Sequence, residues 1–336
     1  MAVVKADAYG HGVKEVSLAA YDTGVRNFAV ATPEEALELR SYIKDGVILI
    51  LSSVERPAYE KLISADITVT VYTEEQILIL DEEAKKLNKT ANAHLKIDTG
   101  MGRIGLRTDE ELHCVLAALK RASNINLTGM FTHFATADET DKSFTQKQFM
   151  RFLSAANAVK SAGFNVICHA SNSAATIWQD KKMHLDMCRM GISMYGYPPS
   201  FDVDMKNCPV KPAMSLYSYI THIKTIMPGE TVSYGRIFTA EKETKIATVA
   251  IGYADGYRRA LSGKAIGFVN GKKVRQVGRV CMDQIMFDVT DVSANEGDEI
   301  LLMGEGFNAD DMAKISGTIS YEILCGISKR VYRIYT

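Results

Sequence analysis

Lys5 stands at a place where a charged side chain needs an explanation. The stretch "AVVKADAYGHG" (residues 2–12) runs from apolar residues directly into Lys5 and continues as a polar loop. An ammonium group at the end of a buried strand is costly unless the amine is paired, deprotonated or used covalently. A lysine amine can form a Schiff base with a carbonyl compound, pyridoxal phosphate included. For Lys5 taken alone, a lysine that extends into solvent is the better interpretation.

Further stretches with chemically useful side chains also follow apolar runs. They are "HLKIDTGMGRIG" (94–105), "THFATAD" (132–138), "CHASNSAAT" (168–176) and "MCRMGISMYG" (187–196). Each alone could be a structural loop, because Asp-Thr-Gly is a good turn in any protein. Gly191, however, lets backbone N–H groups approach a ligand, and phosphate often binds at the end of a parallel barrel. Together with Lys5, these stretches predict one polar site.

The second half of the chain offers weaker signals. Three stretches stand out there, "VSYGR" (232–236), "IGYADGYRR" (251–259) and "VGRVCMDQ" (277–284). Ordinary Gly-Tyr turns and solvated arginines explain them equally well. "CMDQ" is not a metal site, since it has one thiol and no neighbouring histidine.

The elements that must position these residues alternate between strands and helices over the first 200 residues. Capping boxes in "TPEE" (32–35), "TEEQ" (73–76) and "TDEE" (108–111) indicate helix starts. Strands separated by helix-length crossovers indicate a parallel sheet, and eight of them can close a TIM barrel. The predicted strands are 2–5, 27–31, 47–51, 67–71, 93–98, 127–133, 165–169 and 185–190.

A change in composition and in the pattern of apolar runs predicts a second domain. Proline is concentrated in "YPPSFDVDMKNCPVKP" (197–212), and strand-like runs dominate beyond it. "VNGKKV" (269–274) has the Asn-Gly pair of a tight hairpin. We therefore expect an α/β chain with a (β/α)8 TIM barrel over residues 1–208 and a mostly-β domain over residues 209–336.

Composition excludes several functional classes. The formal net charge of the 336 residues is −1, without long basic or acidic blocks, which argues against binding to nucleic acid or to a membrane surface. No apolar run approaches the length of a membrane span, and no signal-peptide pattern opens the chain. The six cysteines form no C-x-x-C pair and are expected to be reduced, which favours a cytoplasmic protein.

As a set, the motifs resemble those of bacterial alanine racemases. "AVVKADAYGHG", "HLKIDTGMGRIG", "THFATADE", "HASNSAAT", "RMGISMYG", "VSYG", "IGYADGYRR" and "GRVCMDQ" occur in the order and spacing of that family over nearly the whole chain. One such motif would be weak evidence, but the series in register is specific. The resemblance implies a fold-type III, pyridoxal 5′-phosphate (PLP)-dependent homodimer. Residues 209–336 of each subunit would complete the active site of the other.

The resemblance also assigns roles to single residues. Lys5 would hold PLP as a Schiff base, and Arg189, oriented by His133, would face the pyridine nitrogen. Arg103 would contact the phenolic oxygen and the substrate carboxylate, positioned by a carbamylated Lys96. The other implied cofactor-binding residues are Tyr9, Asn172, Ser173, Gly191 and Ile192.

Further residues are implied on the partner's side and in the access channel. Tyr234 of the partner subunit would be a catalytic base, and Tyr253 and Met282, also from the partner, would contact the substrate or its path. The implied channel residues are Asp138, His169, Arg258, Arg259 and Arg279.

The implied reaction is the interconversion of L- and D-alanine through the external aldimine of PLP, which would supply D-alanine for peptidoglycan. PLP delocalises the carbanion left when the Cα proton is removed. Lys5 would serve the D-face and Tyr234 the L-face. A lysine or tyrosine has an ordinary pKa of about 10, so Arg103 and Arg189 would have to favour the deprotonated forms. An arginine at the pyridine nitrogen should leave that nitrogen unprotonated and disfavour transamination.

The sequence departs from the family pattern in two places. Family members carry a further strand and helix before the lysine strand, so we expect Met1 to be an internal methionine of a longer chain. Lys329, in "CGISKRVYRIY" (325–335), stands where the family often has a tyrosine near the phosphate and the substrate side chain. Lys329 could pair with the phosphate, or it could open the pocket to serine.

Alternative functions therefore stay open at this point. The first is a serine or serine/alanine racemase, as the catalytic part of a longer membrane-anchored protein. A PLP carrier without turnover is disfavoured because such carriers are single barrels that lack the "VSYG" tyrosine. A lysine Schiff-base aldolase would not need "RMGISMYG". The expected partners are a small amino acid and a second copy of the chain, with no nucleic acid and no membrane in this segment.

Overall fold

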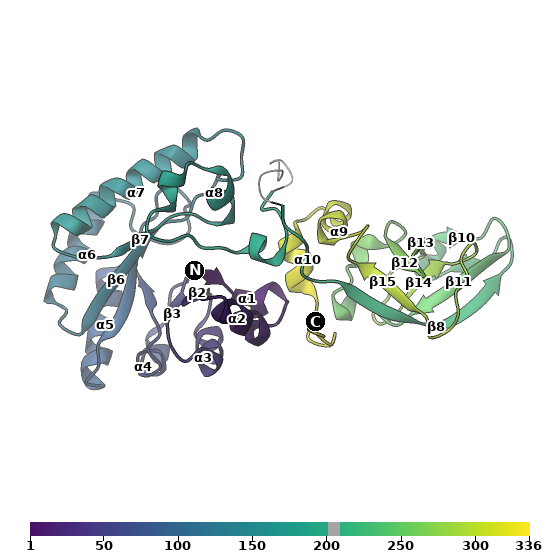
Figure 1. The fold of residues 1–336 in the computed structure, drawn as a ribbon, viewed down its shortest axis with the longest axis horizontal. Helices are drawn as coiled ribbons and strands as arrows, with labels where there is room; N and C mark the ends of the chain where they lie inside the picture. The colour runs from purple at the N-terminus through teal and green to yellow at the C-terminus, as the bar shows by residue number, and fades with distance from the viewer. Residues whose placement is uncertain (201–208) are drawn as a thin grey trace. The chain divides into compact units, whose positions relative to one another are not determined.

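The structure is a computed structural model that describes residues 1–200 and 209–336 (Figure 1). The chain divides into two compact units. Unit 1 contains Met1–Ala8 and Gly12–Met194, and unit 2 contains Tyr9–His11, Tyr195–Tyr197 and Lys211–Thr336. The expected boundary between residues 208 and 209 falls at the edge of the segment outside the described residues.

Unit 1 is built around short parallel strands that alternate with helices (Figure 1). The strands β1 to β3 pair in chain order, and so do β4 to β7. The corresponding predictions are confirmed, with ends shifted by one or two residues. These strands are β1 (Ala2–Val3), β2 (Asn27–Val30), β3 (Val47–Ile50), β4 (Val69–Val71), β5 (Ala91–Lys96), β6 (Ile125–Phe131) and β7 (Ile167–His169).

Isolated parallel bridges join the two sets of strands. Leu49 of β3 bridges to Thr68, just before β4. Ala2 of β1 bridges to Met190, at the eighth position of the ring. Seven strands and one further segment thus form a parallel barrel, as the (β/α)8 prediction requires.

The eighth position is not a regular strand. Asp186 and Arg189 donate backbone hydrogen bonds to the carbonyls of Cys168 and Ser171, at 3.1 and 2.9 Å. Leu185 has a φ of 52°, which breaks the extended conformation at the start of this segment. The predicted strand over 185–190 is therefore wrong as a regular element, although the segment fills the expected place.

Three helices of unit 1 begin where the capping-box signals predicted them. Capping boxes precede α3, α5 and α6, each from a threonine to a Glu or Gln three residues later. The helices are α1 (Lys5–Tyr9), α2 (Val13–Asp22), α3 (Pro33–Tyr42), α4 (Arg56–Ser64), α5 (Glu74–Lys86), α6 (Asp109–Arg121), α7 (Ser143–Ser161) and α8 (Ser173–Trp178), with the 3-10 turns η1 (Lys181–His184) and η2 (Ile192–Tyr195).

Unit 2 contains a closed antiparallel barrel in the order β11-β14-β13-β12-β15-β8. Asn270 and Gly271, both at positive φ, make the tight turn between β12 and β13, which confirms the predicted hairpin. The strands are β8 (Leu216–Ile226), β9 (Thr231–Val232), β10 (Phe238–Thr239), β11 (Thr244–Val249), β12 (Ile266–Val269), β13 (Lys272–Val277), β14 (Ile285–Asp288) and β15 (Glu299–Met303).

Short helical elements complete unit 2. Asn308 caps α9 in a capping box with Asp311, and α10 follows directly. The predicted mostly-β domain included no helix at this place, although Asn308 and Gly317 are ordinary helix-end signals. These elements are η3 (Tyr234–Arg236), η4 (Tyr253–Asp255), η5 (Arg259–Leu261), α9 (Ala309–Ser316) and α10 (Ser320–Gly326).

Across the described residues, every helix is too short or too polar to span a lipid bilayer. The same residues contain no group of three His, Cys, Asp or Glu side chains that could hold a metal ion. The five described cysteines are free thiols, and Cys208 lies outside the described residues.

Candidate active site

Lys5 follows the first barrel strand. The backbone of Val3 donates to the Met190 carbonyl and that of Val4 to the Ala29 carbonyl, each at 2.9 Å. Strand β1 is thereby tied to the neighbouring segments on both sides, just before Lys5. Lys5 is half-buried and opens α1, so the predicted strand 2–5 ends earlier than expected.

The chain after Lys5 forms a left-handed turn. Ala6, Asp7, Ala8 and Tyr9 have φ values of 52–55°, a region that side-chain-bearing residues rarely adopt. A left-handed helical residue costs roughly 1–2 kcal/mol, so this conformation needs support from its surroundings. Part of that support is a hydrogen bond of 2.9 Å from the Ala8 N–H to the Val4 carbonyl.

Asp7 stabilises the exit from this turn. Its carbonyl accepts the Gly12 N–H at 3.0 Å, and its carboxylate accepts the Val13 N–H at 2.8 Å. Glu35 stabilises the entrance, because its Oε1 accepts the Ala6 N–H at 2.7 Å. The turn is therefore held at both ends by carboxylate side chains.

Arg189 lies buried in the barrel with its terminal nitrogens fully engaged. It donates to the carbonyls of Thr132, His169 and Ala170 at 2.7–2.9 Å. It also donates to the Nδ1 atoms of His169 and His133, at 3.0 and 3.4 Å. Burial lowers the pKa of Arg189 to about 10, so the guanidinium remains charged at neutral pH. Within the described residues its Nε–H is the donor left for a ligand.

A chain of neutral histidines extends from Arg189 into the barrel. Arginine can only donate, so His169 Nδ1 accepts and His169 Nε2 carries the proton. His169 then donates to His94 Nδ1 at 3.0 Å. Burial, followed by the charge of Arg189, lowers the pKa of His94 to about 4 and that of His169 well below its usual value. The expected channel position of His169 is wrong, because this side chain is fully buried against Arg189 and His94.

His133 marks the place where the cationic residues meet. Burial lowers its pKa well below the ordinary value. The charges of Arg189, Arg103, Lys96 and Lys5 lower it further, in that order. These four predicted site residues therefore lie within electrostatic range of one imidazole in unit 1. Such a concentration of positive charge favours an anionic ligand.

Lys96 ends strand β5 inside the barrel, 3% exposed. Its Nζ donates to the Ile97 carbonyl at 2.8 Å. Burial, followed by the charge of Arg189, lowers the pKa of Lys96 to about 7, against the opposing effect of Asp98. At neutral pH a large share of this amine is therefore unprotonated and nucleophilic.

Lys96→Met is expected to stabilise the protein at low pH. Between about pH 7 and pH 10.5 the unfolded chain binds a proton that folded Lys96 lacks, so stability rises with pH across this window. Burying protonated Lys96 lowers the free energy of unfolding by an amount on the order of 5 kcal/mol below pH 7, and this cost vanishes near pH 10.5. Urea unfolding in CO₂-free buffer should give the Met variant a higher free energy of unfolding than the parent at pH 6. The difference between the two proteins should be smaller at pH 9. Lys85→Met, at an exposed position, is the control, and an equal gap at both pH values would contradict the prediction.

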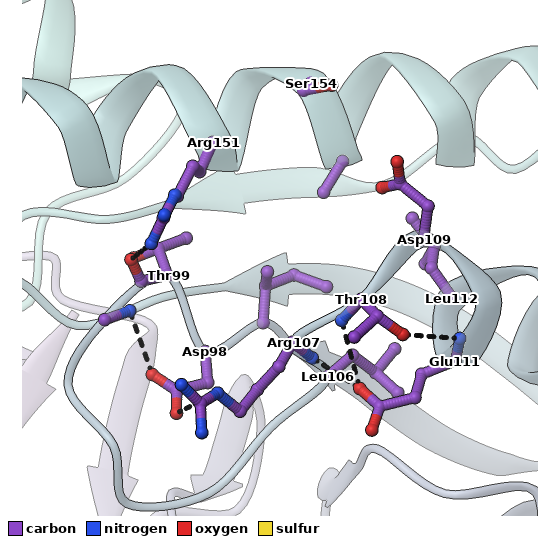
Figure 2. Close-up of a pocket in the computed structure, with 13 residues that line it drawn as sticks. Asp98, Thr99, Leu106, Arg107, Thr108, Asp109, Glu111, Leu112, Arg151 and Ser154 are labelled. Atoms are coloured by element: carbon purple, nitrogen blue, oxygen red, sulfur yellow. Dashed lines mark hydrogen bonds and ion pairs between the residues drawn. The ribbon is translucent and has the colours of Figure 1, made fainter.

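Arg103 lies on the loop that follows Lys96, and Asp98 folds that loop. The Asp98 carboxylate accepts the N–H groups of Gly100 and Gly102 at 3.0–3.1 Å. Arg151 of α7 donates to the Thr99 carbonyl at 3.1 Å, as Figure 2 shows. The start of the loop, with residues of α6 and α7, lines a pocket of about 720 Å³. The loop is therefore shaped by bonds to its own backbone, which leaves Arg103, an exposed side chain, to reach a ligand.

A group of small polar residues lies at the end of the eighth barrel segment. Ser173 Oγ accepts the Gly191 N–H at 2.9 Å, and Asn172 caps α8 by accepting the Ala175 N–H at 2.9 Å. The next turn, η2, begins with Ile192. The N–H of a first helical residue has no acceptor within its own turn. Ser193 Oγ is buried and has no hydrogen-bond partner among the described residues. Hydroxyl and backbone N–H groups of this kind suit a phosphate.

Tyr9 belongs to unit 2 and is almost completely buried. Its ring lies 4.7 Å from that of Tyr195 and 6.0 Å from that of Tyr321, centroid to centroid. Burial raises the pKa of Tyr9, so its hydroxyl stays protonated and can donate. Arg333 holds the following residue, since its Nε and Nη2 donate to the Gly10 carbonyl at 3.2 and 3.1 Å.

Tyr234 is presented outward by a strained turn of unit 2. It is 73% exposed, between Ser233 and Gly235, which have φ values of 68° and 71°. Arg279 supports the turn by donating to the Tyr234 carbonyl at 3.1 Å, and Ser233 Oγ donates to the Arg279 carbonyl at 2.9 Å. The strain lies at Ser233, since glycine adopts a positive φ at no steric cost, and it persists only where the surroundings enforce it.

Tyr253 and Met282, the other predicted partner-side residues, lie on adjoining turns of unit 2. The Tyr253 N–H donates to the Cys281 carbonyl at 3.0 Å, and both predicted side chains are exposed, by 43% and 53%. Arg330 pairs with Asp255 and Asp283 at 3.3 and 2.9 Å, which ties the two turns together. Lys329, next to it, is exposed.

Sequence reasoning missed several of these residues. Ser193 lies inside a quoted motif and could have been found there. His94 has the two-residue spacing from Lys96 that puts both side chains on one face of a strand. Tyr321 and the contact of Glu35 with Ala6 join segments distant in sequence, which no local pattern predicts.

The residues of unit 1 fit PLP. An amine stands at the start of a fixed turn, a buried arginine has one donor left, and an orphaned buried hydroxyl lies beside backbone N–H groups. These features match an aldehyde, a pyridine nitrogen and a phosphate respectively. The surrounding positive charge suits the anionic cofactor.

Comparison with known proteins gives a consistent result. The profile described as "Alanine racemase, N-terminal domain" matches residues 1–199, and that of the C-terminal domain matches residues 213–335. Alanine racemase 1 of Clostridium acetobutylicum is 44% identical over 99% of this chain and 88% of its own length. The alanine racemase of Halothermothrix orenii is 44% identical over 100% of this chain and 89% of its own length.

Solved structures agree with the sequence relatives. The alanine racemase of Clostridium difficile 630 superposes with a TM-score of 0.93 and 43% identity, covering 98% of this chain and 87% of its own. That of Bacillus anthracis, with bound L-Ala-P, gives a TM-score of 0.91 at 38% identity, covering 98% and 86%. The barrel followed by a β-rich domain, the prediction from sequence, is thus confirmed, and the chain belongs to the alanine racemase family.

Proposed function

We propose that this protein is a PLP-dependent alanine racemase that interconverts L- and D-alanine. The observation that carries the proposal is the set of cations around His133, with Lys5, Lys96, Arg103 and Arg189 all acting on one imidazole. The relatives reported above are named alanine racemases and align over almost the whole chain. The proposal therefore rests on a site and on full-length similarity together.

Lys5 would hold PLP through its amine. The phosphate would be bound by Ser173, Gly191, Ile192 and Asn172, with Ser193 as a further donor, and Tyr9 would contribute its protonated hydroxyl. When bound, PLP draws electrons from Cα of the attached amino acid, which makes the Cα proton removable at neutral pH.

Racemisation needs a group on each face of Cα that can accept and return a proton. Lys5 would move the proton on the D-face. Tyr234 of the partner subunit would do so on the L-face, and its 73% exposure in a single chain supports this assignment. A side chain held outward by a strained turn is available to a second subunit.

Arg189 would orient the cofactor ring without giving it a proton. Its terminal nitrogens are committed to three carbonyls and two histidines, so Nε–H would donate to the pyridine nitrogen. With a pKa of about 10 the arginine keeps its own proton at neutral pH. The ring nitrogen would thus stay unprotonated, which disfavours side reactions.

Arg103 would bind the substrate carboxylate, and Lys96 would position it as a carbamate. The unprotonated Lys96 amine would attack CO₂ and release a proton, and the resulting anion would pair with Arg103. The lowered pKa of Lys96, about 7, supports this modification. The charge of Arg103 acts on Lys96, which supports the pairing.

The active unit would be a homodimer with shared sites. Tyr234, Tyr253 and Met282 are large side chains that a single chain leaves exposed. Exposed apolar groups gathered on neighbouring turns favour association. Residues 209–336 would in this way complete the partner's site.

In the cell the enzyme would supply D-alanine for peptidoglycan from the cytoplasm. The serine alternative is not favoured by the relatives. The test is turnover of L-alanine and L-serine by the PLP-loaded protein, with the D-products separated by chiral chromatography. We expect L-alanine to be preferred by about 10-fold or more, since an added hydroxyl leaves an unpaired polar group in the site. Absence of D-alanine would refute the proposal. Preferred formation of D-serine would show that serine, rather than alanine, is the substrate.

A further inference from the structure

We infer that Glu35 is a positioning residue for Lys5, acting through the peptide group that joins Lys5 to Ala6. The inference rests on the proposed function, in which Lys5 holds the cofactor and moves a proton. Glu35 Oε1 accepts the Ala6 N–H at 2.7 Å, and Oε2 accepts the Ala31 N–H, also at 2.7 Å. One carboxylate therefore joins the start of the lysine turn to the end of β2.

Two other capping boxes in unit 1 show what a helix cap alone requires. Gln76 accepts the Tyr72 and Thr73 N–H groups with a single oxygen, at 2.9 and 3.1 Å. Glu111 likewise uses only Oε2, for the N–H groups of Arg107 and Thr108, at 2.6 and 3.1 Å. One oxygen is sufficient for the cap.

Glu35 follows the same pattern and adds a second contact. Its Oε2 serves Ala31 and Thr32, as the single oxygen does in the other boxes. Its Oε1 is directed at Ala6, in a segment 29 residues away in sequence. The second oxygen is thus not needed by α3 and is used by the lysine turn.

The Ala6 N–H is a sensitive place to hold the chain. It belongs to the peptide group that follows Lys5, so its direction fixes the backbone from which the Lys5 side chain projects. Ala6 is also the first residue of the left-handed turn, with φ and ψ both at 52°. A short bond to a charged acceptor is the stronger kind, and it offsets part of the cost of that turn.

Proton transfer by Lys5 depends on this placement. Misplacement of a reacting group by about 1 Å can reduce a rate by about 10²-fold. The Glu35 carboxylate accepts from the backbone N–H groups of Ala6, Ala31 and Thr32. Because these are backbone contacts, the loss of Glu35 should affect the rate of the proton step rather than the affinity for alanine.

Glu35→Gln tests the inference with matched controls. Glutamine keeps the cap, as Gln76 shows, but puts an NH₂ group where Ala6 needs an acceptor. Glu111→Gln makes the same change in a box without the second contact, and Thr32→Ala weakens the cap of α3 while keeping the carboxylate. For Glu35→Gln we expect kcat to fall about 10-fold or more with KM within about 2-fold. Both controls should keep kcat within about 2-fold of the parent.

Two readouts do not depend on turnover. Hydrogen exchange of the peptide that spans residues 1–12 should become about 10-fold faster in Glu35→Gln and not in the controls. The fraction of PLP fixed to Lys5 by borohydride, measured by mass spectrometry, should also fall in Glu35→Gln alone.

Equal kcat and equal exchange in Glu35→Gln and Glu111→Gln would overturn the inference. A loss of stability shared by Glu35→Gln and Thr32→Ala, without a selective effect on kcat or exchange, would likewise reduce Glu35 to a helix cap. If the parent protein makes no D-alanine, the proposed function fails, whereas the exchange experiment still decides whether Glu35 holds the turn.

Discussion

Mixing Lys5→Ala and Tyr234→Phe subunits is expected to restore activity that neither variant has alone. If each site takes Lys5 from one subunit and Tyr234 from the other, a mixed dimer contains one intact site and one doubly damaged site. Random pairing makes half of the dimers mixed, so about a quarter of the parental activity should return. The measurement is racemisation of L-alanine after co-expression of differently tagged chains.

The separate variants should be strongly impaired for different reasons. Lys5→Ala removes both the cofactor anchor and one proton carrier, and a loss on the order of 10⁴-fold is expected. Tyr234→Phe removes only a hydroxyl, and a loss of about 10³-fold is expected, without loss of bound PLP. The absorbance of bound PLP distinguishes the two variants before any assay.

Tyr335→Phe is the matched control for loss of a tyrosine hydroxyl in unit 2. That hydroxyl donates to the His11 carbonyl at 3.0 Å, outside the proposed proton path. If the mixture of Lys5→Ala and Tyr234→Phe chains stays as inactive as its components, shared sites are contradicted. Parental activity of Tyr234→Phe alone would refute the two-base scheme.

Arg189→Met is expected to lower the free energy of unfolding by about 3–5 kcal/mol. The substitution leaves the buried carbonyls of Thr132 and Ala170 without their donor, and leaves the His169 carbonyl with only the Thr132 N–H, at 3.3 Å. A buried group that loses its hydrogen-bond partner costs roughly 1–3 kcal/mol. The variant no longer buries a charge, and this gain offsets part of the cost of the lost hydrogen bonds. The expected loss of stability is therefore smaller than the summed cost of those hydrogen bonds.

The measurement is urea unfolding of the variant beside Arg151→Met. Arg151 is exposed and donates one hydrogen bond, to the Thr99 carbonyl, so its loss should change stability by no more than about 0.5 kcal/mol. Arg189→Lys should be intermediate, because one ammonium group cannot reach the acceptors on both sides. Equal stability of the two Met variants would show that the Arg189 network contributes nothing to folding.

Much of the barrel could be predicted from local patterns. Apolar runs followed by polar loops marked seven strands, and threonine-initiated capping boxes marked three helices. Both signals are local, since they depend on side-chain alternation and on bonds within four residues. The eighth segment was misjudged because Leu185 adopts a φ of 52°. Leucine does not favour positive φ, so the sequence carries no signal for this break.

The arrangement within the site was much less predictable. Lys5 and Arg189 were identified, but the histidine chain that fixes Arg189 joins β5, β7 and the eighth segment. The left-handed turn after Lys5 could not be read from Ala6, Asp7 and Ala8, because none of them favours it strongly. Contacts between distant segments decide these features, and sequence patterns record only near neighbours.

The passage of Tyr9–His11 through unit 2 has a consequence for engineering. Arg333 and Tyr335, at the far end of the chain, bind the carbonyls of Gly10 and His11. A chimaera that exchanged the C-terminal half between two relatives at a single crossover would therefore separate this loop from the tail with which it evolved. Transplanting the second half should work only when residues 9–11 travel with it as a second, short graft.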